Sequence, residues 1–434
     1  MNELKVGQDY NVEITSLTHE GLGVGRAEGV AVFVFNALVG EEVLVTITEV
    51  RKTFCFGKVK KIIKKSEERV KPICPLYGKC GGCNFMHLTY ESQLKAKFEI
   101  FKQVLKRLGK LEDVRVKEIV SANKIYNYRN KVVVVFKKVK DDIIFGFYRR
   151  DTHEIERMEK CFLFDDALAA ILKSIQEFIK TDIENNYISS VAFRINEKKE
   201  VLIGLNVTRK KMHFLKTLVP FLTEKYSNII SVVVYEEEKD KYNTFLGKGR
   251  IKENILGFNY NISIDDFFQT NKEQTEKLYQ KVLEYAGDDL NVVVDGYCGI
   301  GSITLPLSKV SKKVYGIEVY ETSVKDAIRN KEANNVNNVH FILGKAEEKI
   351  KEITDKIDLI VVDPPRKGCE PALLNSIIEK KIEKIIYVSC DPATLSRDLK
   401  VLSDEGYEIK EISLFDMFPN TTHVECVVLM SRVK

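Results

Sequence analysis

The sequence predicts a multidomain α/β protein, with a small N-terminal β-barrel, a central α+β domain and a C-terminal domain built on a doubly wound parallel sheet. Three observations predict this architecture. The chain of 434 residues is too long for one ordinary core, short β-like runs crowd its beginning, and strands alternate regularly with helices toward its end. We expect the domains to span residues 1–60, 61–262 and 263–434.

The composition is that of an ordinary globular protein, because 44% of the residues are hydrophobic and 30% are charged. No stretch is long and apolar enough to span a bilayer, and the N-terminus lacks the cationic and apolar regions of a signal peptide. We therefore expect a cytoplasmic protein without a membrane partner. In that reducing compartment cysteines are read as metal ligands, nucleophiles or core residues, and not as disulfides.

Residues 1–60 contain short alternating runs such as "YNVEITSL", "VAVFVF" and "EEVLVTITEV", broken by the Gly-rich "HEGLGVGRAEG". About five short strands favour a closed barrel of the OB type, although an SH3-like barrel or a β-meander fits the same pattern. From Arg51 to Lys71 there are nine Lys or Arg residues against two Glu. This excess indicates a polyanionic partner, and the alternative is a solvated lysine-rich face.

The central residues begin with a Cys- and Gly-rich segment and an amphipathic helix, "ESQLKAKFEIFKQVLKRLG", which ends at Gly109. Cys74, Cys80 and Cys83 have the spacing Cys-x5-Cys-x2-Cys, and Cys161 is a distant fourth. Four thiolates suit either tetrahedral zinc or an iron–sulfur cluster, and the spacing does not separate them. Since four ligands would leave no open metal position, we expect a structural site.

From residue 263 the strands read "NVVVD", "KVYGIE", "VHFIL", "IDLIVVD", "KIIYVS", "YEIKEISL" and "VECVVLM", with helices between most of them. The first five fit right-handed parallel crossovers. The last two are separated by "FDMFPNTTH", which is too short for a helical crossover, so they should pair antiparallel. Five parallel strands followed by such a pair form the Rossmann-like sheet of a class I methyltransferase.

A Gly-rich turn follows the first of these strands, in "VVVDGYCGIGSITLPLS". Gly296, Gly299 and Gly301 let a ligand approach the backbone after Asp295, and the next helix offers free N–H groups. Glu318 ends the following strand, where a carboxylate can accept hydrogen bonds from ribose hydroxyls. Because the GxGxxG spacing is absent, S-adenosylmethionine fits better than NAD. The alternative for Glu318 is a charge that stabilises a helix N-terminus.

A second motif, "LIVVDPPRKG", places Asp363 at the rim of the same cleft. Amino-group methyltransferases also carry Asp-Pro-Pro but follow it with an aromatic residue. Here Arg366 follows, which argues against methylation of an exocyclic amine.

The stretch "YVSCDPATLSRDL" presents Cys390 just past a buried strand and beside a helix N-terminus, which we expect to lower the pKa of the thiol. A thiolate is useful when the methyl acceptor is a weak carbon nucleophile such as C5 of uracil. Addition to C6 turns C5 into an enolate carbon, and a base must then remove the C5 proton. The alternative is an inert core cysteine.

Glu425 in "FPNTTHVECVVLM" is the carboxylate within reach of that edge, with His423 two residues earlier. A strand period of two would put both side chains on one face. The alternative is the polar face of an edge strand, but a carboxylate in so apolar a run is costly.

Together these motifs resemble one family, the S-adenosylmethionine-dependent RNA uracil-C5 methyltransferases, and within it the ribosomal branch that carries a TRAM domain and a 4Fe-4S iron–sulfur cluster. The resemblance covers essentially the whole chain: the barrel, the cysteines, and "FFQTN", "DGYCGIGSI", "DPPRKG", "SCDPATLSRD" and "FPNTTHVE" in order. It implies that Cys390 is the nucleophile and Glu425 the base. The residues that would line the S-adenosylmethionine site are Gln269, Tyr297, Glu318 and Asp363.

The resemblance also implies that Cys74, Cys80, Cys83 and Cys161 hold the iron–sulfur cluster, and that the RNA face includes Arg129, Lys131, Arg149 and Arg150. One departure is Lys345 in "LGKAEE", where some relatives have an Asp placed to meet the adenine amine.

We expect a monomer that acts on a uridine of 23S ribosomal RNA, flipped out of a loop because a thiol cannot reach the C6 atom of a stacked base. Two alternatives remain: the same chemistry on transfer RNA, and a non-catalytic RNA-binding assembly factor.

Overall fold

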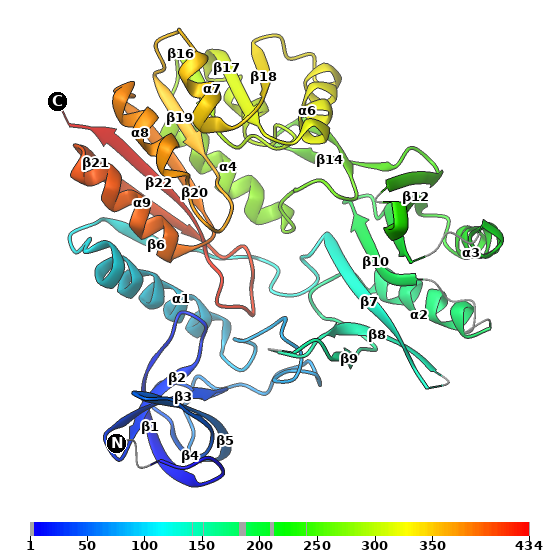
Figure 1. Ribbon diagram of the computed structural model, residues 1–434, viewed down its shortest axis with the longest axis vertical. Helices are drawn as coiled ribbons and strands as arrows, with labels where there is room; N and C mark the ends of the chain where they lie inside the picture. Colours follow the sequence, from blue (N-terminus) through cyan, green and yellow to red (C-terminus); the bar gives the residue numbers. More distant parts are fainter. Residues whose placement is uncertain are drawn as a thin grey trace.

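The computed structural model describes residues 4–140, 142–150, 152–181, 188–208, 212–239 and 241–433, which form a barrel and two large sheets (Figure 1). The barrel lies at the bottom of the view, a seven-stranded sheet to the right and an eight-stranded sheet to the upper left. No helix in these ranges is both long and apolar enough to cross a membrane.

The barrel consists of β1 (Asp9–Leu17), β2 (Gly23–Ala27), β3 (Val30–Phe35), β4 (Glu42–Val50) and β5 (Phe54–Lys64). It closes in the order β1-β2-β3-β5-β4, so the predicted closed barrel is confirmed. The Gly-rich segment predicted as a break contains β2. A Cβ atom on Gly25 would lie 2.3 Å from the Glu13 carbonyl oxygen, so the close packing of β1 on β2 requires a glycine there.

A bidentate ion pair joins the barrel to the Cys- and Gly-rich segment that follows it, residues 65–89, which we call the cysteine segment. The Arg69 guanidinium donates to both carboxylate oxygens of buried Glu41, at 2.6 and 2.7 Å, and to the Asn36 carbonyl oxygen at 2.6 Å. A bidentate pair between a guanidinium and a carboxylate fixes the relative orientation of the two side chains as well as balancing their charges. The segment that follows the barrel therefore leaves it in a defined direction.

Helix α1 (Tyr90–Val104) forms where the amphipathic pattern predicts it, with Thr89 as N-cap. It passes into one π-helical turn, η1 (Leu105–Gly109), before Lys110 adopts a left-handed φ of 53°. Strand β6 (Val116–Val120) then joins the C-terminal sheet in parallel with β21 (Tyr407–Phe415). The residues expected to form one central domain, 61–262, are thus divided, because α1 and β6 pack on the C-terminal sheet.

The seven-stranded sheet has the order β13-β12-β11-β10-β7-β8-β9. Helices α2 and α3 bury their apolar residues against one face of it. The bounds are β7 (Lys131–Val139), β8 (Asp142–Tyr148), β9 (Ile155–Arg157), α2 (Asp166–Lys180), β10 (Ile188–Ile195), β11 (Val201–Val207), α3 (Met212–Lys225), β12 (Ile229–Glu236), η3 (Glu237–Lys239) and β13 (Lys241–Leu246).

The hairpin of β14 (Arg250–Ile255) and β15 (Phe258–Ser263) lies between the two large sheets. Its apolar residues share one buried cluster with Ala192 and Leu202 of the central sheet and Val293 and Val314 of the C-terminal sheet. The two sheets are therefore connected through a continuous core.

The C-terminal sheet has the order β18-β17-β16-β19-β20-β22-β21-β6. The neighbours β18, β17, β16, β19 and β20 are parallel, and so are β21 and β6, whereas β22 runs antiparallel to both β20 and β21, as the short connection predicts. The bounds are α4 (Lys272–Ala286), β16 (Leu290–Asp295), α5 (Thr304–Leu307), β17 (Ser311–Glu318), α6 (Glu321–Ala333), β18 (Val339–Leu343), α7 (Ala346–Glu352), β19 (Leu359–Val362), α8 (Pro371–Glu379), β20 (Lys384–Ser389), α9 (Pro392–Asp404) and β22 (Glu425–Arg432).

Candidate active site

Cys390 and Glu425 lie side by side at one edge of the C-terminal sheet. Ser389, the last residue of β20, pairs with Cys426 of antiparallel β22, so the next pair in register is Cys390 with Glu425. The Glu425 charge raises the pKa of the Cys390 thiol, so the two side chains lie close to each other just past the last ladder pair. The thiol is half-buried and the carboxyl group is buried. Two strand ends thus bring together the predicted nucleophile and the predicted base.

The pKa of the Cys390 thiol is raised to about 12, first by burial and then by the negative charges of Glu425 and Asp363. The predicted lowering by the helix N-terminus is therefore wrong. Asp391 is the N-cap of α9 and accepts from the N–H groups of Ala393 and Thr394, so those donors are already used. Among the charged groups around Cys390, Arg366 is the one that lowers the pKa of the thiol.

Acidic groups crowd this edge. Burial and the Asp363 charge raise the pKa of Glu425 well above its usual value, and burial and the Asp295 charge raise that of Asp363. Arg366 also acts on Glu425, in the direction that favours the carboxylate. Sequence reasoning used Arg366 only to exclude amine methylation, but its position makes it the cation that balances this acidic edge.

The Gly-rich turn after β16 has the features of a ligand site. Within the described residues, the buried Oδ1 atom of Asp295 and the buried hydroxyl of Tyr297 have no hydrogen-bond partner. Gly299 has a φ of 52°, and a Cβ atom there would meet open space. The turn therefore combines unpaired buried polar atoms with an unfilled approach to the backbone, which fits a nucleotide-type ligand.

Glu318, at the end of β17, holds this turn in place. One of its oxygens accepts from the Gly299 N–H at 3.0 Å and the other from Val319 and Tyr320, at 2.8 and 2.9 Å. A carboxylate has about four acceptor positions, so about one remains for a ligand. Gln269 is buried before α4, beside Thr270, whose side chain lines a large cavity. Lys345 is exposed and pairs with Glu348 at 3.6 Å.

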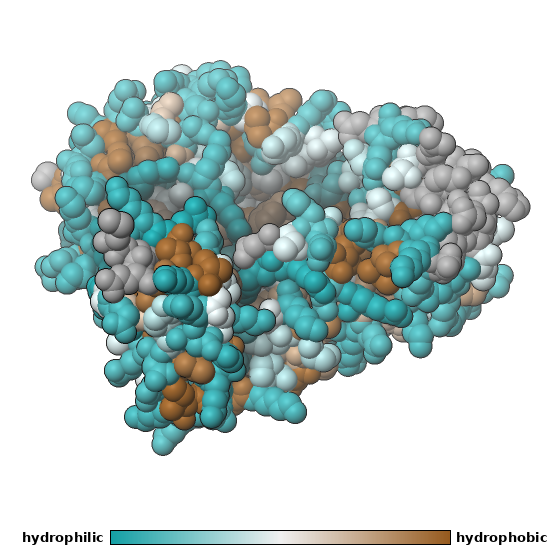
Figure 2. All heavy atoms as spheres, turned by 60° about the horizontal axis from the view of Figure 1, so that its bottom comes forward, coloured by the Kyte–Doolittle hydropathy of each residue, from teal (hydrophilic) through white to brown (hydrophobic). Residues whose placement is uncertain are grey.

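This cavity has a volume of about 1140 Å³ and extends from the barrel to Cys390. Figure 2 shows the largely hydrophilic face of the molecule, which is hollowed near its middle. The walls include Glu20 and Phe35 of the barrel, several cations, and Cys390 with His423. His423 is exposed and precedes β22, so the predicted strand alternation with Glu425 does not apply to it.

The predicted cationic residues contribute unequally to this cavity, which all four line. Arg129 lies over the Phe418 ring at 5.5 Å, and its buried Nε has no partner among the described residues. Arg150 lies over the Phe35 ring of the barrel at 5.3 Å. Arg149, by contrast, is paired with Glu154 and Glu156 at 3.0 and 2.6 Å, and burial lowers the pKa of Lys131 to about 8.

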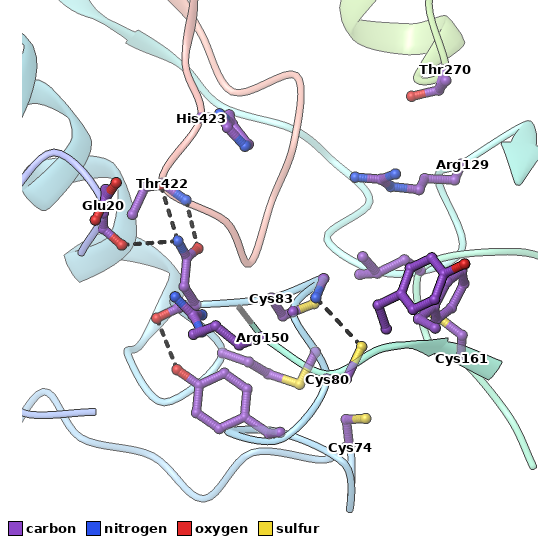
Figure 3. A pocket seen from close by; sticks show the side chains of 18 of the residues that line it. Glu20, Cys74, Cys80, Cys83, Arg129, Arg150, Cys161, Thr270, Thr422 and His423 are labelled. Atoms are coloured by element: carbon purple, nitrogen blue, oxygen red, sulfur yellow. Dashed lines mark hydrogen bonds between the residues drawn. The ribbon is translucent and has the colours of Figure 1, made fainter. Parts of the chain in front are cut away.

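The four predicted metal ligands line the same cavity (Figure 3). Cys74, Cys80, Cys83 and Cys161 come from two segments that are far apart in the sequence. Burial and the neighbouring thiols raise the pKa of Cys83, and burial raises that of Cys161 to about 11. However, the described residues contain no group of three or more Cys, His, Asp or Glu side chains arranged to hold a metal ion. The predicted iron–sulfur centre is thus not shown, although its four candidate ligands gather in one place.

Sequence reasoning missed a buried ion pair beneath this site. Lys97 of α1 donates to Asp416, in the loop between β21 and β22, and both side chains are fully buried. The Lys97 ammonium also donates to the Phe418 carbonyl oxygen at 3.0 Å, and the Tyr90 hydroxyl donates to Asp416 at 2.8 Å. In the sequence Lys97 is one of several lysines of an amphipathic helix. Its burial depends on a partner 319 residues away, which no local pattern reveals.

Comparisons with known proteins place the chain in a family. Residues 89–433 match the sequence model of the tRNA (uracil-5-)-methyltransferase family, and residues 3–60 match that of the TRAM domain. An RNA methyltransferase of Clostridium acetobutylicum, described as uncharacterized, is 41% identical, with 99% of this chain and 98% of the relative covered. Another from Bacillus cereus is 39% identical, with 98% and 96% covered.

Among solved structures, the tRNA (uracil-54, C5)-methyltransferase of Pyrococcus abyssi in complex with S-adenosyl-L-homocysteine has a TM-score of 0.77 and 27% identity. The match covers 97% of this chain and 99% of that one. The chain therefore belongs to the tRNA (uracil-5-)-methyltransferase family of S-adenosylmethionine-dependent RNA methyltransferases, and its N-terminal barrel is a TRAM domain.

Proposed function

We propose that this protein methylates C5 of a uridine in RNA, with Cys390 as nucleophile and Glu425 as base. The observation that carries the proposal is the cross-strand pairing of β20 with β22, which sets a thiol opposite a buried carboxyl group at the edge of a large cavity. The uracil ring needs both groups, because C5 becomes a carbon nucleophile only after a thiolate has added to C6.

Each residue has a distinct task in this mechanism. The Cys390 sulfur forms a bond to C6, and the electron pair of the C5–C6 double bond moves toward the O4 carbonyl. S-adenosylmethionine, when bound, would supply the electrophilic methyl group that C5 takes up, and S-adenosylhomocysteine would be the leaving group. Glu425 then accepts the proton of C5, the double bond re-forms, and the sulfur leaves as a thiolate.

Arg366 would assist the first step, because its positive charge acts on Cys390 against the negative charges of Glu425 and Asp363. The raised pKa of Glu425 suits a base, since a carboxylate with a higher pKa binds the C5 proton more strongly. The methyl donor would be held by Gln269, Tyr297, Glu318 and Asp363. The unpaired Tyr297 hydroxyl and the open approach at Gly299 support that placement.

For the RNA we propose a uridine of 23S ribosomal RNA, flipped from a loop into the cavity. A thiol must approach C6 from above the ring, so the base has to leave its stack. The cavity is lined by cations and extends to the barrel, which suits an RNA strand bound on both sides of the flipped base. Ribosomal RNA is favoured because the barrel, the cysteine pattern and the motifs together resemble the ribosomal branch of the family.

A second candidate substrate is transfer RNA. The Pyrococcus abyssi structure, which matches nearly the whole chain, is that of a tRNA methyltransferase. The two substrates are separated by mapping 5-methyluridine in ribosomal and transfer RNA from a strain without this gene, and again after wild-type or Cys390→Ala protein is restored. Loss and recovery of a ribosomal site supports the first candidate, and loss of a transfer RNA site alone supports the second.

We further propose that Cys74, Cys80, Cys83 and Cys161 hold a 4Fe-4S cluster, because all four residues line one cavity and three of the thiols raise the pKa of the fourth, Cys83. Four cysteine ligands would leave no iron of the cluster with an open coordination position, which suits a structural role. Anaerobically purified protein should absorb visible light in the range of iron–sulfur clusters, and Cys80→Ala should lose it. Zinc without iron in elemental analysis would contradict the cluster.

The mechanism has a direct chemical test. An RNA in which 5-fluorouridine replaces the target uridine has no C5 proton for Glu425 to remove. Wild-type protein with S-adenosylmethionine should remain joined to this RNA in denaturing electrophoresis, and Cys390→Ala should not. If the wild type forms no such adduct, the mechanism is wrong. If it also binds no S-adenosylmethionine, a non-catalytic RNA-binding role gains support.

A further inference from the structure

The loop between β21 and β22, residues 416–424, is held by parts of the chain that lie far from it in the sequence. Figure 1 shows it reaching from the large sheet down to the first third of the chain. Asn420 is fully buried with a φ of 68°. It exchanges two hydrogen bonds with Gln93, donates to the Ile125 carbonyl oxygen at 2.7 Å, and accepts from the N–H groups of Asn84 and Phe85. All its hydrogen-bonding groups are thus used to fix the loop.

Asn84 is the point where three parts of the molecule meet. Its side-chain oxygen accepts from the Thr422 N–H at 2.8 Å. Its side-chain nitrogen donates to the Thr422 hydroxyl at 3.1 Å and to the Glu20 carbonyl oxygen at 3.1 Å. Thr422 belongs to the loop that enters β22, Glu20 to the barrel and Asn84 to the cysteine segment, directly after Cys83. In Figure 3, dashed lines join the labelled Glu20 and Thr422 to this one amide.

The barrel also packs directly against Thr422, through Gly21. Gly21 has a φ of 82°, and a Cβ atom on it would lie 2.7 Å from the Thr422 methyl group and 2.8 Å from the Phe85 ring. Real Cβ atoms do not approach so closely, so any other residue at this position would displace Thr422 or the barrel loop. The barrel loop is therefore closely packed against Thr422 and Phe85, with no space for a side chain at position 21.

Thr422 lies three residues before Glu425, in a connection that the sheet does not hold. The pairing of β22 with β20 and β21 begins only at Cys426 and Glu425, so Thr422, His423 and Val424 form no ladder pairs with those strands. The direction from which the chain enters the strand depends on Asn84 and on the barrel loop. Glu425 itself pairs with Phe415 of β21, so Thr422 fixes the direction in which the chain reaches this first residue of the strand.

We propose that Asn84 is a positioning residue for the elimination step: it fixes Thr422, and through it the entry to Glu425, and so makes proton removal depend on the docking of the barrel and the cysteine segment. The inference rests on the proposed function. It adds that the N-terminal parts act on catalysis as well as on RNA binding.

Loss of the Asn84 side chain should impair one step of the reaction. Attack of the Cys390 sulfur on C6 and uptake of the methyl group at C5 do not require Glu425, whereas release of the product does. A misplaced carboxylate should therefore leave the protein covalently joined to methylated RNA that contains ordinary uridine. General loss of folding would lower every step and would not accumulate this adduct.

The experiment uses the full-length protein with ordinary uridine RNA and S-adenosylmethionine. For Asn84→Ala we expect kcat to fall by about 10- to 100-fold, the size of effect that small misplacements of catalytic groups produce. A denaturant-resistant adduct, absent from the wild type, should appear. Gly21→Ala should give the same adduct from the barrel side. With 5-fluorouridine RNA, Asn84→Ala should form its adduct at the wild-type rate, because addition is intact.

Two comparison variants make the outcome decisive. Asn84→Asp keeps the acceptor for the Thr422 N–H and can accept from the Thr422 hydroxyl, but it loses the bond to the Glu20 carbonyl oxygen of the barrel, so its kcat should lie between those of Asn84→Ala and the wild type. Asn338→Ala removes an amide that likewise donates two hydrogen bonds, to Ser308 and Ser311, at the opposite edge of the sheet, and should match the wild type.

An unchanged kcat in Asn84→Ala, or a lower kcat without an adduct from ordinary uridine RNA, would overturn the inference while the proposed function stands. Absence of methyl transfer by the wild type would instead overturn the proposed function, and this inference with it.

Discussion

At the scale of the residue, Glu425 can be tested apart from Cys390. In Glu425→Gln the buried side chain keeps its size and loses its basicity, so C5 proton removal should slow while addition continues. We expect kcat to fall by about 10²- to 10⁴-fold, the usual contribution of a positioned base. The adduct with ordinary uridine RNA should be visible by denaturing electrophoresis and mass spectrometry. Its absence would mean that another group removes the proton.

The pKa of Cys390 sets the expected pH dependence. Burial and the charges of Glu425, Asp363 and Asp391 raise the pKa of this thiol to about 12, so it is mostly protonated at neutral pH. Because the thiolate is the nucleophile, the rate of adduct formation with 5-fluorouridine RNA should rise by about tenfold per pH unit between about pH 6.5 and 9. A flat profile would show that thiolate formation does not limit the rate.

Arg366 provides a second test of the same charge balance. Its positive charge lowers the pKa of Cys390, so Arg366→Met should reduce the thiolate fraction and slow adduct formation at every pH below that pKa. Arg432→Met, an exposed arginine at the far end of β22, serves as control. Equal rates in the two variants would contradict the assignment.

At the scale of the element, the strands were predictable because their apolar runs are strong local signals. The barrel strand β2 was not predictable, because its glycines resemble those of a turn. Only the folded barrel shows that the close packing of β1 on β2 requires a glycine at position 25. Likewise Cys390 and Glu425 could each be placed at a strand end, but their direct opposition depends on the register of β20 with β22. The pKa of Cys390 was mispredicted because burial and the charges of Glu425 and Asp363 raise it, while Asp391 already occupies the helix N–H groups.

The docking of α1 gives an element-scale prediction. Lys97→Met leaves Asp416 buried without its cation, which typically costs about 3–5 kcal/mol in the free energy of unfolding. Lys95→Met, on the exposed side of the same helix, should change stability little. Urea denaturation followed by circular dichroism measures both. The double variant Lys97→Met with Asp416→Leu should recover part of the loss, and an equal loss in Lys95→Met would contradict the pairing.

At the scale of the whole molecule, one cavity connects three parts that the sequence presents separately: the barrel, the cysteine segment and the sheet edge with Cys390. Local motifs predicted each part. Their meeting was not predictable, because the contacts join residues as distant as Asn84 and Thr422. The barrel, the cysteine segment and Cys390 thus share the lining of one cavity.

This arrangement predicts that the basic end of the barrel contributes to RNA affinity and not to chemistry. Four exposed lysines lie on or just after β5, namely Lys58, Lys61, Lys64 and Lys65. Replacing all four by Gln should weaken RNA binding and reduce the slope of log K against log salt by up to about 0.7 per lost phosphate contact. The single-turnover rate at saturating RNA should stay unchanged, because none of these four side chains lines the cavity that reaches Cys390. The control replaces Lys351, Lys356, Lys380 and Lys381 near α7 and α8, which removes the same charge from the opposite end of the molecule in Figure 1. Equal changes in salt slope for the two variants would mean that net charge, and not the barrel surface, governs binding.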